Sequence, residues 1–165
     1  MIERCFEDHV PGTTSEHDTL RVTTDEIVDI GRRFDQQPFH VDADAAAAGP
    51  FGGLIASGWH TCALMMRLLA EEYLPPASSL GSPGADELRW IQSVRPGDEL
   101  TLRATVEDGR VSRSRPDRGI VRTPASHRCG DPSGQSAAVV RGRRCRRPRA
   151  EAEPALASAA VMDPA

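Results

Sequence analysis

The segment from Ser57 to Leu74 constrains the fold more than any other part of the chain. Its apolar residues cover almost the whole circumference of a helix, and two consecutive prolines follow it directly. About 18 residues at about 1.5 Å each give a helix about 27 Å long, enough to cross a small domain. His60 and Arg67 lie inside the run and argue against a membrane span. We therefore expect a buried central helix.

The residues after this helix favour strands. A short strand-like piece lies earlier, around residues 20–22, and residues 85–94 ("ADELRWIQSV") alternate between apolar and polar side chains. Residues 100–108 ("LTLRATVED") alternate again, and 117–123 ("DRGIVRT") predict a further strand. Consecutive strands without intervening helices indicate an antiparallel sheet. The predicted fold class is α+β, with one antiparallel sheet wrapped around the long helix.

The length and the terminal composition set the domain organisation. A chain of 165 residues fits a single domain. We expect this domain to span residues 1–142, and the arginine-rich, then Ala/Pro-rich residues 143–165 are typical of a disordered tail. The N-terminus has no apolar run of the secretory kind, so we expect a cytoplasmic location. The four cysteines are widely spaced, and we expect neither a metal site nor a disulfide framework.

Asp35 and His40 stand out because a proline separates them. A helix is predicted over residues 24–34, begun by a capping box at Thr23, and Asp35 lies at its end. Pro38 prevents a continuous helix, so we expect His40 in the loop that follows.

A carboxylate and an imidazole held on a short segment can together bind one water and exchange protons with a substrate. Imidazole titrates near neutrality, and an aspartate can act as a base when its surroundings raise its pKa. The alternative is that both side chains only satisfy nearby backbone groups. The spacing alone leaves both interpretations open.

Glycines approach the start of the long helix. A very short helix is predicted over residues 43–48, with Asp42 as its N-cap and Gly49 as a left-handed stop. Gly52, Gly53 and Gly58 then bring unobstructed backbone to the long helix, where amide groups without acceptors favour a developing negative charge. An oxyanion hole and simple tight packing are both open here.

Residues 34–61 ("FDQQPFHVDADAAAAGPFGGLIASGWHT") resemble the hydratase motif of the MaoC-like dehydratase family. This is the hotdog-fold group that includes (R)-specific enoyl-CoA hydratases. The motif is an Asp, four intervening residues, a His with an acid two residues on, and a glycine-rich approach to a helix. The similarity continues to "SRSRPDRGIVR" and covers residues 5–122. The resemblance implies a hotdog fold, paired subunits in a homodimer, and acyl-CoA thioester substrates, with coenzyme A part of the substrate rather than a separate cofactor.

The resemblance also implies roles for individual residues. Asp35 and His40 match the catalytic dyad, and Gly58 matches the glycine whose N–H binds the thioester oxygen. Ser57, Trp59 and Gly53 are expected to bind substrate. The implied reaction is the addition of water to a trans-2-enoyl-CoA to give a 3-hydroxyacyl-CoA, or its reverse, so the chain is expected to be a hydro-lyase.

Three alternatives stay open. A hotdog thioesterase would attack the same thioester at its carbonyl carbon, but it usually carries an acid on or beside the central helix, and none precedes Glu71 there. The composition changes abruptly after Thr123, which leaves room for an inactive hotdog subunit. Six arginines in residues 141–149 suggest an anion-binding module, but no aromatic residue accompanies them for stacking on bases. We expect neither a nucleic acid nor a membrane as partner.

Overall fold

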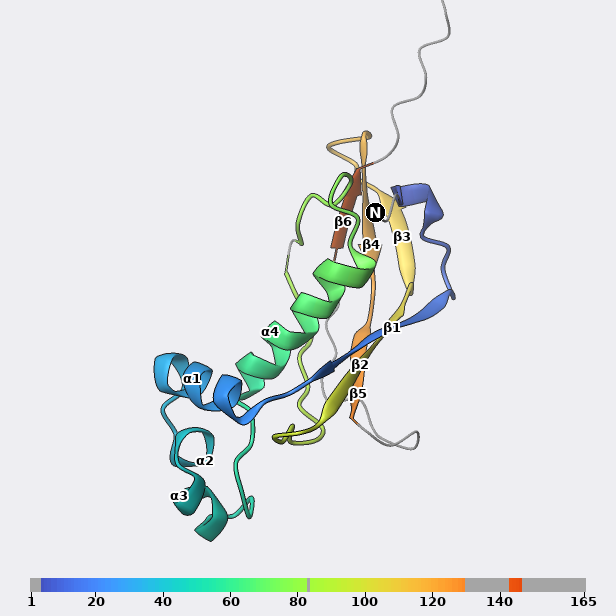
Figure 1. Cartoon of the computed structure of the whole chain (residues 1–165). Helices are drawn as coiled ribbons and strands as arrows, with labels where there is room; N and C mark the ends of the chain where they lie inside the picture. Colours follow the sequence, from blue (N-terminus) through green and yellow to red (C-terminus); the bar gives the residue numbers. More distant parts are fainter. Residues whose placement is uncertain (1–3, 83, 130–142, 147–165) are drawn as a thin grey trace, which may run out of the picture.

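The computed structural model describes residues 4–82, 84–129 and 143–146. Two three-stranded antiparallel sheets, with strand orders β1-β2-β5 and β3-β4-β6, form the layer against which helix α4 lies (Figure 1). The predicted α+β class is confirmed. The helices are α1 (Thr24–Phe34), α2 (Pro38–Val41), α3 (Ala43–Ala48) and α4 (Gly58–Leu68), with short turns η1 (Phe6–Asp8) and η2 (Leu69–Tyr73). The strands are β1 (Thr14–Arg21), β2 (Glu99–Thr105), β3 (Asp108–Val111), β4 (Arg118–Arg122), β5 (Ala125–Cys129) and β6 (Arg143–Arg146).

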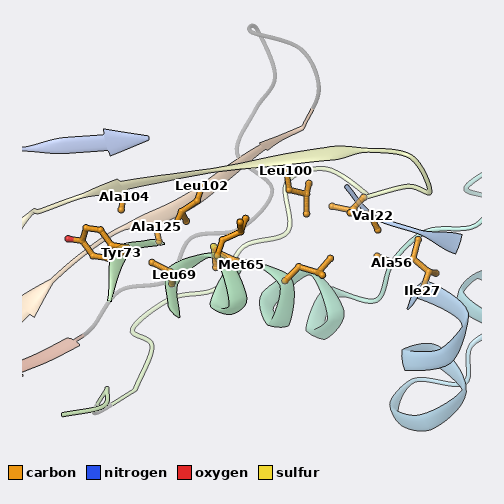
Figure 2. Close-up of a cluster of buried hydrophobic side chains, with 13 residues drawn as sticks. Val22, Ile27, Ala56, Met65, Leu69, Tyr73, Leu100, Leu102, Ala104 and Ala125 are labelled. Carbon is orange, nitrogen blue, oxygen red and sulfur yellow. The ribbon is translucent and has the colours of Figure 1, made fainter. Parts of the chain in front are cut away.

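The core lies between α4 and the sheet of β1, β2 and β5. Alternate residues of β2 are buried, and they face the helix across the core (Figure 2). The predicted long helix is present, but its last part, η2, is wound as a π-helix. The buried side chains shared by these elements include Leu64, Met65, Leu68, Tyr73, Leu100 and Leu102.

Two of the three predicted helix-capping features around the first helices are confirmed. The capping box is present, because the Thr23 hydroxyl accepts from the Glu26 amide at 3.2 Å and the Glu26 carboxylate accepts from the Thr23 amide at 3.4 Å. Asp42 caps α3 as predicted, accepting two amides at 3.0 Å. The left-handed stop at Gly49 was wrong, since its φ is −86° and its ψ is −179°. Pro50 follows, and a residue before proline is driven towards extended geometry.

Residues 85–94 do not form the predicted strand. No partner strand lies beside them in the described part of the chain, and Trp90 and Ile91 are exposed. Strand β1 is longer than the piece predicted around residues 20–22. Its outer position in the sheet keeps its residues exposed or half-buried, so the sequence there lacks a clear alternation.

The segment after Thr123 contributes strands that the sequence did not predict. Residues 125–129, for which no strand was predicted, form β5 and pair with β2, with Leu102 opposite His127. Arg143–Arg146, where the predicted tail begins, form β6 and pair with β4. Residues 130–142 and 147–165, with the rest of the arginine cluster, lie outside the described residues. In the part of the chain that is described, no helix is long and apolar enough to cross a membrane.

Candidate active site

The site lies where α1, α2 and the N-terminal end of α4 meet, at one end of the molecule (Figure 1). His40 Nε2 lies 3.4 Å from Asp35 Oδ2, with the imidazole buried and the carboxylate half-buried. Asp35 is the C-cap residue of α1. The expectation that His40 lies in a loop was wrong, because Pro38 begins the single turn of α2, which contains His40. Proline is suited to the first helical position, since its missing N–H has no acceptor there in any case.

Gly31 allows α2 to approach α1 closely. It is buried, and a Cβ atom placed on it would lie 2.9 Å from Cγ1 of Val41 and 3.1 Å from Cβ of His40. Any larger residue at this position would push α2 away from α1. This role could not be predicted from the sequence, because a glycine inside a predicted helix indicates only a weak point of that helix.

The backbone of Ile55 fixes the orientation of His40. The Ile55 carbonyl oxygen lies 2.7 Å from His40 Nδ1, and the Ile55 amide donates to the Phe39 carbonyl at 3.1 Å. A carbonyl oxygen can only accept, so Nδ1 carries a proton. In the neutral ring, Nε2 is then an acceptor that faces the Asp35 carboxylate.

Asp35 is held as a carboxylate by its neighbours. Gln37 Nε2 donates to Asp35 Oδ1 at 2.8 Å, and this hydrogen bond is the main reason that the pKa of Asp35 lies below its ordinary value. The Ser57 hydroxyl acts in the same direction, as does the charge of His40 when its ring is protonated, while partial burial opposes them. The surroundings of Asp35 therefore do not raise its pKa, which is the condition given above for an aspartate to act as a base. The pair presents two acceptors, Asp35 Oδ2 and His40 Nε2, towards one another.

Gly58 begins α4 with Ser57 as its N-cap, so its amide has no acceptor within the helix. None of the hydrogen bonds formed among the described residues uses this amide. Asp35, His40 and Gly58 all line one cavity of about 400 Å³. The three residues picked out by the sequence are thus brought together.

The predicted substrate-binding residues divide into two groups. Trp59 lines the cavity, whereas Gly53 and Ser57 do not, and Ser57 instead reaches Asp35 through its hydroxyl. Gln37 was not predicted as a site residue, although its position two residues after Asp35 and directly before Pro38 indicated that it lies beside the dyad. Trp90 was predicted to lie in a strand. The remaining lining residues are Phe51, Ile55, Ala56, Thr61, Ile91, Gln92, Ser93 and Val94.

Other candidate chemistry is limited. Among the residues whose side chains the structure describes, no group of three or more His, Cys, Asp or Glu could hold a metal ion. His60 is buried near the site, and burial lowers its pKa. Asp35 and His40 can together bind a water between their two acceptor atoms, and the Gly58 amide can stabilise a nearby oxyanion.

Comparison with known proteins places this geometry in a family. The family model described as "MaoC like domain" matches residues 7–127. The uncharacterized protein YdeM of Bacillus subtilis is 33% identical over 96 residues, which are 58% of this chain and 68% of that protein. A 3-hydroxyacyl-thioester dehydratase Z of Mycobacterium tuberculosis is 39% identical over 67 residues, which are 40% of this chain but only 44% of that protein.

Solved structures also resemble this chain. A MaoC-like dehydratase from Rhodospirillum rubrum superposes with a TM-score of 0.79 at 38% identity, covering 88% of this chain and 99% of that one. The R-hydratase PhaJ1 from Pseudomonas aeruginosa gives a TM-score of 0.64 at 22% identity, covering 91% of this chain and 94% of that one, and shows the shared fold alone.

Proposed function

The chain belongs to the MaoC-like domain family, with its hotdog fold, and from this premise we propose that it is a hydro-lyase acting on acyl thioesters. The reaction is the addition of water to a trans-2-enoyl-CoA to give a 3-hydroxyacyl-CoA, or the reverse dehydration. The observation that carries the proposal is the 3.4 Å approach of His40 Nε2 to Asp35 Oδ2 in the cavity that Gly58 also lines.

The first step activates water. A water bound between the two acceptors donates one O–H to Asp35 and the other to His40. Its oxygen attacks the β-carbon of the enoyl thioester while one member of the pair takes its proton. The electron pair of the double bond moves towards the thioester carbonyl, which becomes an enolate oxygen.

The second step completes the addition. The Gly58 N–H stabilises the enolate oxygen, as an oxyanion-hole donor does. A proton then passes from the pair to the α-carbon, the carbonyl re-forms, and the dyad returns to its starting state. Dehydration follows the same path in reverse.

A direct assay separates this reaction from thioester hydrolysis. With a trans-2-enoyl-CoA, we expect loss of the enoyl absorbance without release of free thiol. A thioesterase would release thiol from saturated acyl-CoA as well. Within α4, whose first turn holds no acid, no carboxylate is available for that chemistry. Thiol release at a rate equal to or above the loss of enoyl absorbance would refute the proposal.

Gln37 acts as a positioning residue for the dyad. Its amide donates to the Asp35 carbonyl at 2.8 Å, its carbonyl accepts from the His40 amide at 2.9 Å, and its side chain holds Asp35 Oδ1. Gln37→Glu removes this side-chain donor and adds a negative charge, so the pKa of Asp35 rises. Because Asp35 works as a carboxylate, we expect the acidic limb of the pH–rate profile to move to higher pH. The rate at mildly acidic pH should fall about tenfold or more.

Gln36→Glu is the matched control for this change. Gln36 is the exposed neighbour whose side chain donates to the Arg32 carbonyl at 2.6 Å, so the variant adds the same charge without touching the Asp35 carboxylate. Its acidic limb should stay close to that of the wild type. An unmoved limb in Gln37→Glu would remove the proposed role of Gln37.

The remaining expectations belong with this proposal. We infer that two copies pair as a homodimer, that coenzyme A enters only as part of the substrate, and that the enzyme works in the cytoplasm. The known relatives support an acyl-thioester substrate through the 3-hydroxyacyl-thioester dehydratase among them.

A further inference from the structure

Trp90 lies directly on the backbone of Gly58. Its indole N–H donates to the Gly58 carbonyl at 2.9 Å, and a Cβ atom placed on Gly58 would lie 2.6 Å from Cε2 of the ring. The ring also packs edge-to-face on Trp59, with centroids 6.0 Å apart, and it contacts the thiol of Cys62. Although Trp90 lies outside any strand or helix, three neighbours from α4 hold it in place.

The position of the indole relative to the Gly58 amide follows from helix geometry. In an α-helix, each Cα–Cβ bond is tilted towards the N-terminus of the helix. The N–H of the first helical residue points in that same direction. A ring whose nearest atoms lie 2.6, 2.7 and 3.1 Å from the Cβ position of Gly58 therefore lies beside the place where an oxygen bound to the Gly58 amide would sit.

The other face of Trp90 forms part of the cavity wall. The side chain is 48% exposed and lines the same cavity as Asp35 and His40. Both tryptophans of the chain line this cavity. Large apolar side chains exposed together in this way mark a surface that binds an apolar group.

From this contact we propose that Trp90 is a specificity-determining residue, whose indole limits the space at the α-carbon of the acyl group and so selects against α-branched acyl thioesters. The inference rests on the proposed function, because it takes the Gly58 amide as the donor to the thioester oxygen. The α-carbon is bonded to that carbonyl, so a methyl group on it projects towards whatever wall flanks the amide.

The selectivity is measured with two substrates that differ by one methyl group, crotonyl-CoA and 2-methylcrotonyl-CoA. For the wild type, we expect kcat/KM to favour crotonyl-CoA by about tenfold or more, the discrimination that one methyl group gives in a fitted pocket. Trp90→Ala should lower this ratio about tenfold. Met66→Ala is the control. Met66 is an apolar residue of α4 that is 46% exposed but does not line the cavity, so this variant should leave the ratio unchanged. A ratio that Trp90→Ala does not alter overturns the inference.

A double substitution tests the contact itself. Gly58→Ala keeps the amide but forces a methyl group into the indole, and we expect it to lower kcat/KM for crotonyl-CoA on the order of tenfold. Combining it with Trp90→Ala removes the clash and should restore most of that loss. The loss of kcat/KM in the double variant could instead equal the product of the losses in the two single variants. In that case the two residues act independently and the inference fails.

A binding experiment separates failure of this inference from failure of the proposed function. In Trp59→Phe, Trp90 is the sole tryptophan, and its fluorescence is followed during titration with the unreactive butyryl-CoA and 2-methylbutyryl-CoA. We expect a saturable change with the first and weaker binding of the second. This result without any hydration of enoyl-CoA would uphold the role of Trp90 and refute the proposed reaction. Hydration of enoyl-CoA without a change in Trp90 fluorescence would uphold the proposed reaction and refute the role of Trp90.

Discussion

Replacing Asp35 by Asn or His40 by Ala is expected to lower the turnover of a trans-2-enoyl-CoA by a factor on the order of 10² to 10⁴. Asp35→Asn keeps the size of the side chain and an oxygen that can accept from Gln37, but it removes the negative charge that accepts a proton. His40→Ala removes the one imidazole among the described residues that line the cavity. The measurement is the steady-state rate of hydration, with circular dichroism to establish that each variant is folded.

The two residues should behave as one unit. Because both hold the same water, the double variant should be hardly slower than the worse single variant. His40→Gln serves as a second variant, since its amide can still donate to the Ile55 carbonyl while it lacks a titratable ring. Asp42→Asn is the matched control, because Asp42 caps α3 and does not line the cavity. Losses that multiply in the double variant would show that the two side chains act in separate steps.

The second large effect concerns stability and depends on His127. Its side chain is 0% exposed on β5, and neither ring nitrogen has a hydrogen-bond partner among the described residues. Burial lowers the pKa of His127 from 6.5 to about 4. The unfolded chain therefore binds a proton at this position at a pH where the folded chain does not.

The sign of the pH dependence follows from this difference. Between about pH 4 and pH 6.5 the unfolded state holds more protons, so the free energy of unfolding rises with pH across this window. The part of the free energy of unfolding that depends on neutral His127 is fully present above pH 6.5 and is lost as the pH falls to about 4. Its size is about 3 kcal/mol. Denaturant unfolding at several pH values measures it directly.

His127→Leu supplies the matched comparison. Leucine leaves no unpaired ring nitrogen in the core, so the variant should be more stable than the wild type and should lose most of the slope in this pH window. His17 and His60 also have pKa values lowered by burial and should leave a residual slope. If His127→Leu keeps the full slope of the wild type, this histidine is not the source of the acid sensitivity.

Sequence reasoning predicted the parts of the fold where local signals agree with packing. The capping residues Thr23 and Asp42, the buried long helix and the alternation in β2 all act through nearby atoms, so they were readable from the sequence. Strand β5 was not readable, because it places a histidine at a core position and an arginine next to it. Its strand character depends on pairing with β2, which lies far away in the sequence.

The site shows the same division. Asp35, His40 and Gly58 were found from a motif, and the structure places them around one cavity. Gly31 and Trp90 were missed because their roles are contacts made across the fold, with α2 and with the start of α4. The lowered pKa of Asp35 could not be predicted, because it is set by a side-chain contact with Gln37 that spacing does not reveal.

The most direct test of the proposed chemistry follows the oxygen atom of the water. Wild-type protein is incubated with crotonyl-CoA in water labelled with heavy oxygen, and the products are analysed by mass spectrometry. We predict an intact CoA thioester carrying the label on its β-carbon, with very little product from Asp35→Asn. Label found in the carboxyl group of a free acid, or equal β-labelled product from wild type and Asp35→Asn, would contradict the assignment of Asp35 and His40 as the pair that activates water.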